Sequence, residues 1–234
     1  DQFSNTSNAD STMDETYNLL TKEINSIVKE KSLTIPLVIN GVQIDDRESE
    51  EGLDPNNNGA VWYTYKVAKQ SDIDSAVKAA VKAGSNWEAL GADARANILQ
   101  KFAKIAFAQQ EETIAIMARD AGKTVSEADP EVSEAIDFAN YYALSAISLD
   151  LENQSSPLGV VVVVPPWNFP YAIPTGGICA ALAAGNSVIF KSAPETVATS
   201  WQLVNQLWRA GVPKDVLQFV STEDNEIGQS LITH

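Results

Sequence analysis

The 234-residue sequence contains one cysteine, Cys179, and one histidine, His234. A single cysteine excludes an intrachain disulfide framework and a cysteine-based metal site, and a single histidine excludes a multi-histidine zinc site and a histidine-mediated triad. Cys179 lies in an apolar, small-residue stretch that disfavours a thiolate, so we expect it to be an inert core residue. Low cysteine use agrees with a reducing compartment, and we predict a cytoplasmic location and no metal site.

Basic side chains are scarce as well, with 16 Lys and Arg against 31 Asp and Glu, which gives a net charge of −15. This surplus repels phosphates, so we expect no nucleic-acid partner. The longest apolar run, residues 158–166, is far shorter than the roughly 20 residues of a membrane-spanning helix. The first residues also lack the basic and apolar segments of a secretory signal. With 44% hydrophobic residues, the chain is nevertheless able to bury a substantial core.

The first part of the chain is acidic and contains one helix and one hairpin. Residues 1–12 are polar and predict a disordered tail, and apolar residues at helical spacing predict an amphipathic helix over 13–29. Asn40-Gly41 separates two β-rich runs and predicts a hairpin over 36–44. We expect a loop over the acidic residues 45–58, and then a strand over 61–67.

Residues 70–150 predict helices with little strand content. One helix opens at Ser71, whose hydroxyl is placed to cap the first backbone N–H groups. A second, longer helix ends at Gly122, and a third runs from Pro130 to Leu149. We therefore treat residues 34–156, the hairpin together with these helices, as one part of the chain, which follows the acidic leader of residues 1–33.

From residue 157 the pattern changes to strands that alternate with helices. Five consecutive valines, 160–164, predict a strand buried on both faces. A helix over 178–184, a strand over 187–191, a helix over 195–210 and a strand over 216–220 follow. We predict an α/β fold in which a Rossmann-like parallel βαβαβ half-sheet, residues 157–234, follows the helical and β-hairpin section.

Ligands of such a sheet bind beyond the carboxyl ends of its strands, which here are residues 165–170 and 191–195. Asn168 lies in a proline-rich, rigid loop, where its amide could donate to a developing oxyanion or could only satisfy loop carbonyls. Lys191 could donate to a ribose or a phosphate, or could be an ordinary charge at a strand end. The sequence contains neither a G-x-G-x-x-G motif after a strand nor a P-loop.

Four motifs in order resemble the aldehyde dehydrogenase superfamily over about residues 34–234. They are Pro166-Trp167-Asn168-Phe169-Pro170, Ala180 to Val188, Lys191, and Ala210-Gly211-Val212-Pro213. Within the superfamily, Ala121-Gly122-Lys123-Thr124 and Glu134 to Phe138 resemble the L-glutamate γ-semialdehyde (1-pyrroline-5-carboxylate) dehydrogenases, including the module of the bifunctional proline utilisation A proteins. A start at Asp1 fits a module that follows a proline dehydrogenase domain.

The resemblance implies a role for each matching residue. It makes Asn168 the catalytic side-chain donor to the oxyanion, and it places Phe169 and Glu134 at the aldehyde substrate. The residues that it implies for the dinucleotide are Val164, Pro165, Pro166, Trp167, Lys191, Glu195 and Gly228. Glu195 comes one position later than the ribose-binding glutamate of many relatives. The acidic groups at 223–224 would repel a 2′-phosphate, so we expect NAD as the cofactor while NADP stays open.

The family's nucleophilic cysteine and its general base belong to a part beyond His234, so the resemblance implies an amino-terminal half that lacks the catalytic domain. The implied reaction of the whole enzyme is NAD-dependent oxidation of L-glutamate γ-semialdehyde to glutamate, and we predict no turnover by this chain alone. Another aldehyde or an acyl-CoA-forming semialdehyde dehydrogenase stays open, as does a noncatalytic nucleotide-binding or assembly module. Residues 148–157 are short where many relatives carry a strand pair that contacts a second subunit, so the oligomeric state also stays open.

Overall fold

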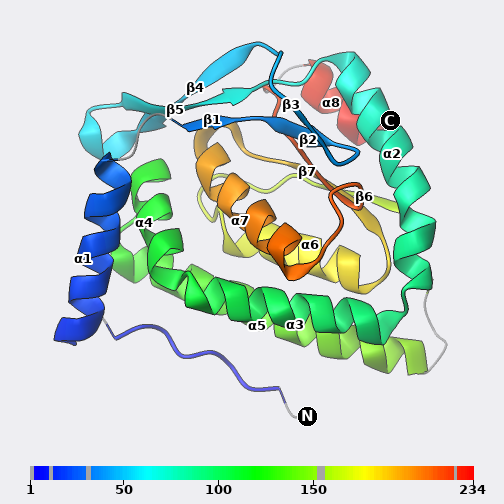
Figure 1. Cartoon of the computed structure of the whole chain (residues 1–234), viewed down its shortest axis with the longest axis horizontal. Coiled ribbons are helices and arrows are strands. Elements are labelled where there is room, and N and C mark those ends of the chain that lie inside the picture. Colours follow the sequence, from blue (N-terminus) through cyan, green and yellow to red (C-terminus); the bar gives the residue numbers. More distant parts are fainter. Residues whose placement is uncertain (1–2, 11–12, 30–32, 152–155, 224–225) are drawn as a thin grey trace.

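The computed structural model describes residues 3–10, 13–29, 33–151, 156–223 and 226–234. Its main sheet has the strand order β3-β2-β8-β7-β6 (Figure 1). The edge strand β6 and its neighbours β7 and β8 run parallel to one another. Two helices connect them, so the chain passes through β6 (Val160–Val163), α6 (Ala172–Ala183), β7 (Ser187–Lys191), α7 (Val197–Ala210) and β8 (Leu217–Val220). The predicted βαβαβ half-sheet is confirmed.

The predicted hairpin completes this sheet. Its strands are β2 (Leu37–Ile39) and β3 (Val42–Ile44), and the turn residues Asn40 and Gly41 both have positive φ, 51° and 78°. These angles are typical of a type I′ turn, which Asn-Gly favours. β2 also pairs with β8 in the antiparallel direction, with Val38 opposite Phe219. The hairpin therefore extends the sheet on the side of β8 that faces away from β7.

A second sheet of three strands contains the strand predicted over 61–67 and one strand in the region predicted as a loop. Its order is β1 (Leu33–Ile35), β5 (Ala60–Lys66), β4 (Ser49–Asp54), and a short helix η1 (Pro55–Asn57) joins β4 to β5. The expected loop is present over 45–48, but the expectation is wrong for 49–54, which pair with β5. Glu50 and Glu51 are exposed on this edge strand, which tolerates charge, whereas the buried Asp54 pairs with Arg119 at 2.9 Å. Gly52 faces the ring of Tyr63 so closely that an added Cβ would lie 2.0 Å from it.

The predicted helical section consists of four helices. They are α2 (Gln70–Ala89), α3 (Ala92–Ala108), α4 (Gln110–Asp120) and α5 (Val125–Leu151). The single helix expected up to Gly122 is wrong, since Gln109, with φ −116°, separates α3 from α4. The cap expected from Ser71 is also wrong. Asp72 accepts the Lys69 N–H at 2.9 Å instead, and Arg47 pairs with the same carboxylate at 2.8 Å.

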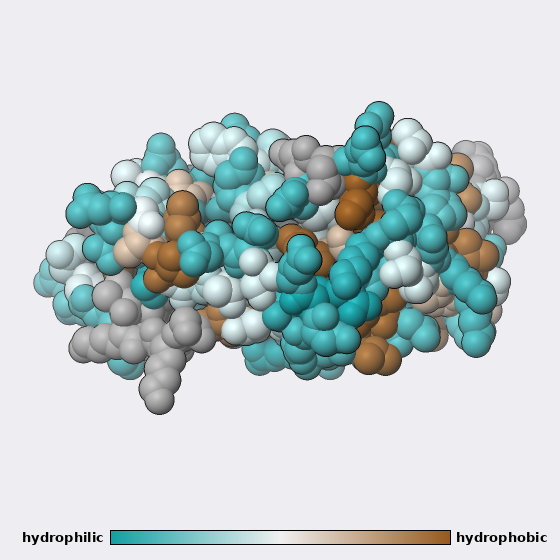
Figure 2. All heavy atoms as spheres, turned by 90° about the horizontal axis from the view of Figure 1, so that it is seen from above, coloured by the Kyte–Doolittle hydropathy of each residue, from teal (hydrophilic) through white to brown (hydrophobic). Residues whose placement is uncertain are grey.

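Helices cover both faces of the main sheet. On one face, α2 and α8 (Glu226–Thr233) bury Ile189 of β7 in a small core. On the other face lie α6 and α7, with α3 and α5 beyond them (Figure 1). Val188 and Phe190 are buried there in a larger core. The valines of β6 are mostly half-buried, contrary to prediction, because β6 is the edge strand of the described sheet. Seen from above, the surface is largely hydrophilic, with hydrophobic residues in small separate patches (Figure 2).

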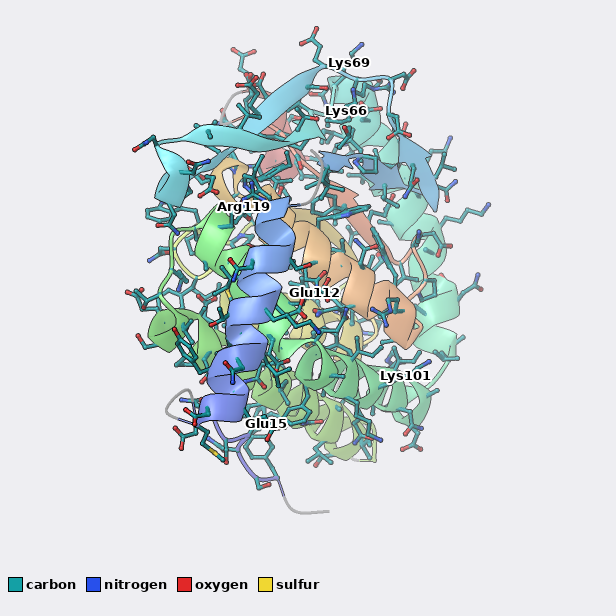
Figure 3. The ribbon with its side chains drawn as sticks, turned by 60° about the vertical axis from the view of Figure 1, so that its left-hand side comes forward. Glu15, Lys66, Lys69, Lys101, Glu112 and Arg119 are labelled. Atoms are coloured by element: carbon teal, nitrogen blue, oxygen red, sulfur yellow. The ribbon has the colours of Figure 1, made fainter. Side chains whose placement is uncertain are left out.

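The amino-terminal section lies against the helices. The predicted helix is present as α1 (Asp14–Lys29), which lies beside α4, with Glu15 at the end opposite the sheets (Figure 3). The disorder predicted for residues 1–12 is wrong for residues 3–10, which contact α5. The Thr6 N–H donates to Asp137 at 2.7 Å, and the Phe3 ring meets that of Tyr141 edge to face at 5.7 Å.

Two absences hold for the described part of the chain. No helix there is both long and apolar enough to cross a bilayer. The same residues contain no group of three or more His, Cys, Asp or Glu side chains that could hold a metal ion.

Candidate functional site

The segment 164–170 lies between the carboxyl end of β6 and the start of α6 and exposes large apolar side chains. Val164, Trp167 and Phe169 are 42%, 51% and 42% exposed. Asn168, between the two aromatic residues in the sequence, is exposed, whereas Pro165 is buried. The segment therefore presents one carboxamide and two aromatic rings at the sheet edge where α/β folds bind ligands.

A buried carboxylate anchors the end of this segment. Glu131 of α5 is 1% exposed, and its Oε2 accepts the N–H groups of Tyr171 and Ala172, both at 3.1 Å. Its Oε1 forms an ion pair with Lys123. The Lys123 Nζ also lies 4.3 Å from the centre of the Phe169 ring, a cation–π contact. Neither residue was predicted for the site, because the contacts of Glu131 with Tyr171 and Ala172 join positions 40 and 41 residues apart.

Glu134, expected at the substrate entrance, is exposed on α5. It lies three residues after Glu131, and residues at this spacing share a face of a helix. Close packing fixes α5 against α6, since a Cβ added to Gly176 would lie 3.2 Å from the Phe138 ring. Glu134 thus lies about one turn along α5 from Glu131, and the described contacts do not join it to Phe169.

Gly228, in the first turn of α8, lies beside Lys191 at the carboxyl end of β7. A Cβ at Gly228 would come within 2.9 Å of the Thr222 Oγ1 and 3.9 Å of the Lys191 Cε, so glycine permits this close approach. Lys191 is 6% exposed and Thr222 is 1% exposed. Among the described residues, the Thr222 hydroxyl has no hydrogen-bond partner. A buried hydroxyl of this kind is open to a ligand's polar group, and sequence analysis did not identify it.

Trp167 and Glu195 line a different feature, a cleft of about 710 Å³ between the small sheet and the short helix η2 (Pro194–Thr196). Asp120 forms part of its wall and accepts hydrogen bonds from the Tyr63 hydroxyl at 2.9 Å and from the N–H and hydroxyl of Thr199, both at 2.8 Å. Burial raises the pKa of Asp120 to about 7, because the lost hydration outweighs these hydrogen bonds. Lys191 does not line this cleft, so the expected cofactor residues fall into two groups.

Cys179 is buried in α6, as predicted. Burial raises the pKa of its thiol well above the ordinary value, since the low-polarity surroundings disfavour a thiolate. Within the described residues, the site therefore offers amide, hydroxyl and ammonium donors and aromatic surface, but no activated cysteine nucleophile.

Comparisons with known proteins agree with this arrangement. Residues 43–234 match the model of the aldehyde dehydrogenase family. A 1-pyrroline-5-carboxylate dehydrogenase of Staphylococcus aureus (strain MW2) is 34% identical over 245 aligned residues, which cover 100% of this chain and 48% of that protein. The corresponding protein of Staphylococcus saprophyticus is 37% identical over 210 residues, which cover 85% of this chain and 41% of that protein.

Solved structures are similar over the whole chain. A 1-pyrroline-5-carboxylate dehydrogenase from Thermus with bound NAD superimposes with a TM-score of 0.94 at 29% identity, covering 100% of this chain and 48% of that one. Proline utilization A from Bdellovibrio bacteriovorus gives a TM-score of 0.93 at 26% identity, covering 100% of this chain and 26% of that one. The chain spans about half the length of the curated relatives that it matches.

Proposed function

Because this chain belongs to the aldehyde dehydrogenase family, we propose that its full-length protein oxidises L-glutamate γ-semialdehyde to glutamate with NAD. The support for this substrate is the similarity to 1-pyrroline-5-carboxylate dehydrogenases across the whole chain. This chain supplies one side of the reaction site, and residues outside it supply the nucleophile and the general base. We further propose the division into residues 1–33, 34–156 and 157–234, with the last part binding the dinucleotide.

One observation carries the proposal: Asn168 and Phe169 are exposed together at the carboxyl end of β6, on a segment anchored to α5. A carboxamide fixed in advance stabilises developing negative charge without reorganising during the reaction. The neighbouring aromatic ring supplies apolar surface for the carbon chain of an aldehyde. Glu134, on the adjoining face of α5, would line the entrance to the same place.

The residues at the ends of β7 and β8 fit a dinucleotide. Lys191 carries a positive charge, the Thr222 hydroxyl has no described partner, and Gly228 keeps the space between them free of a side chain. These groups suit ribose hydroxyls and phosphate oxygens. We propose that Lys191, Thr222 and Gly228 hold one part of NAD, and that Val164, Pro165, Pro166 and Trp167 lie along another part. For Glu195 we propose a contact with the cofactor from the side of the cleft.

Bound NAD supplies a hydride acceptor for the aldehyde carbon. In the proposed reaction, a cysteine thiolate from outside this chain attacks that carbon, and the electron pair of the carbonyl moves to oxygen. The Asn168 side-chain N–H donates to this oxyanion. Hydride loss leaves a thioester, and an activated water then cleaves it to the carboxylate and the free thiol. The chain's own part is to hold the oxyanion, the aldehyde chain and the cofactor in place.

Substitution of Asn168 in the full-length protein tests the proposal. We expect Asn168→Ala to lower kcat by about 10²- to 10³-fold, the usual cost of one oxyanion donor. NAD binding, measured by the quenching of protein fluorescence, should stay the same in Asn168→Ala. Lys191→Ala should weaken NAD binding. Unchanged kcat in Asn168→Ala, with NAD binding retained, would overturn the catalytic proposal in favour of a nucleotide-binding module. Turnover by this chain alone would also contradict it.

Three further proposals concern another domain of the full-length protein, its location and its partners. Similarity to proline utilization A, a longer protein of which this chain covers 26%, supports a further domain in the full-length protein, which we propose is a proline dehydrogenase. A cytoplasmic location, expected from low cysteine use, stays a prediction. The partners that we propose are the aldehyde and the remaining catalytic domain, and we propose no nucleic acid.

A further inference from the structure

We infer that Lys123 and Glu131 are positioning residues, which hold the segment 165–170 so that the Asn168 carboxamide is aimed at the reacting oxygen. This inference rests on the proposed function of Asn168. It assigns a task to an ion pair that touches neither the aldehyde nor the cofactor in the proposed reaction. The two residues act through the segment between β6 and α6.

Glu131 fixes the end of the segment. Its side chain is 1% exposed, so its negative charge depends on the ion pair of Oε1 with Lys123 and on the two N–H groups that donate to Oε2. The two N–H groups that it accepts belong to Tyr171 and Ala172, where α6 begins. The first N–H groups of a helix have no partner within the helix, and the helix dipole favours an anion there. The carboxylate therefore determines where α6 starts and where the segment before it ends.

Lys123 fixes the middle of the segment. Its ammonium, whose side chain is 11% exposed, is shared between the Glu131 carboxylate and the face of the Phe169 ring. Phe169 follows Asn168 directly, so the orientation of the ring limits the backbone angles available to the carboxamide. Without the ammonium, the ring would lose its cation–π partner and Glu131 would lose its counter-charge.

The backbone around Lys123 is itself fixed, so the ammonium has a defined starting point. Gly122 has a φ of 69°, and a Cβ there would lie 3.2 Å from Pro55. On the other side, the Thr124 N–H donates to the Glu127 carboxylate at 2.9 Å, which caps the start of α5. A lysine that served solubility alone would have neither a fixed backbone nor a buried carboxylate as its partner.

Kinetics of the full-length protein test this inference. Lys123→Met removes the charge and keeps the length of the side chain. Lys101→Met, the same change at an exposed lysine of α3, is the matched control (Figure 3). We expect Lys123→Met to lower kcat per active site at least tenfold, with the KM for NAD within twofold of wild type. Lys123→Arg should restore most of the loss, because a guanidinium supports both contacts.

A double-mutant cycle separates positioning from general damage to the fold. If Lys123 acts through Asn168, the change Lys123→Met should alter kcat less than threefold once Asn168 is already alanine. Independent effects would instead multiply, and this result would overturn the inference. So would an unchanged kcat in Lys123→Met.

Hydrogen exchange provides a readout that does not depend on activity. In Glu131→Gln a neutral amide oxygen replaces the carboxylate, so the hydrogen bonds from the Tyr171 and Ala172 N–H groups become weaker, and this variant keeps the inference testable if Lys123→Met fails to fold. We expect the amides of Tyr171 and Ala172 to exchange at least tenfold faster in either variant, while those of β7 stay protected. Unchanged exchange would refute the anchoring. Faster exchange together with a fully active Asn168→Ala would refute the proposed function alone.

Discussion

Replacing Asp120 with asparagine should change how the stability of this fold depends on pH. Asp120 is 4% exposed and accepts three hydrogen bonds from Tyr63 and Thr199. Its pKa rises from the ordinary 3.8 to about 7 on folding, with burial as the main cause. Asparagine has nearly the same size and keeps an oxygen for Thr199, so it removes the titration while preserving most of the packing.

The magnitude follows from proton linkage. Between about pH 5 and pH 7 the folded protein holds a proton on Asp120 that the unfolded chain has released. In this range the wild type loses about 1.4 kcal/mol of unfolding free energy per pH unit from this group. The contribution is fully present below the unfolded pKa and is lost as the pH rises through the folded pKa. Over the two units it sums to about 2 to 3 kcal/mol.

Urea unfolding near pH 5, 6, 7 and 8 measures this effect. The unfolding free energy of Asp120→Asn minus that of wild type should rise by about 2 to 3 kcal/mol between pH 5 and 7, and then level off. All other carboxylates are shared by both proteins and cancel in the difference. Asp93→Asn makes the same change at an exposed carboxylate and should give a nearly constant difference. A flat or falling curve for Asp120→Asn would refute the reasoning.

Three further predictions concern packing. Arg95→Met should lose about 2 to 4 kcal/mol of unfolding free energy, because the buried guanidinium donates to backbone carbonyls that end α2 and α6. A loss under 1 kcal/mol, measured by urea unfolding, would contradict this. Gly52→Ala should lower the free energy of unfolding by about 2 to 3 kcal/mol, since its Cβ would strike the Tyr63 ring. Gly84→Ala in α2, where the nearest atom is 3.7 Å away, should raise it by about 0.5 to 1 kcal/mol. Cys179 should react with a thiol reagent only after unfolding, and rapid labelling of the native protein would count against its burial.

The sequence predicted those parts of the fold whose signals are local. Five consecutive valines, the Asn40-Gly41 turn and the spacing of helices and strands after residue 157 each depend on neighbouring residues, and the βαβαβ order is confirmed. The acidic strand β4 escaped prediction because its pairing with β5 outweighs its poor local propensity. The break at Gln109 escaped because both helices flanking it continue the same apolar spacing.

The candidate site could be predicted only in part, for a related reason. Motif residues such as Asn168 and Lys191 lie at strand ends, where topology alone places them. Glu131 depends on contacts across the fold, and Thr222 on a close approach of α8, neither of which a short pattern encodes. Glu195 lies at the cleft and not beside Lys191, because it belongs to the short helix η2, which begins at Pro194.

The pairing of the hairpin with β8 has a consequence for protein synthesis. The Asn40 N–H bonds to the side chain of Gln218, so the sheet joins positions 178 residues apart. A ribosome that adds about 5 to 20 residues per second reaches the second position roughly 10 to 40 s after the first. During that interval Leu37 and Ile39, both buried in the finished fold, have no β8 to pair beside them. The nascent chain therefore exposes an unpaired, apolar strand edge at the hairpin, which is a segment that a chaperone would protect.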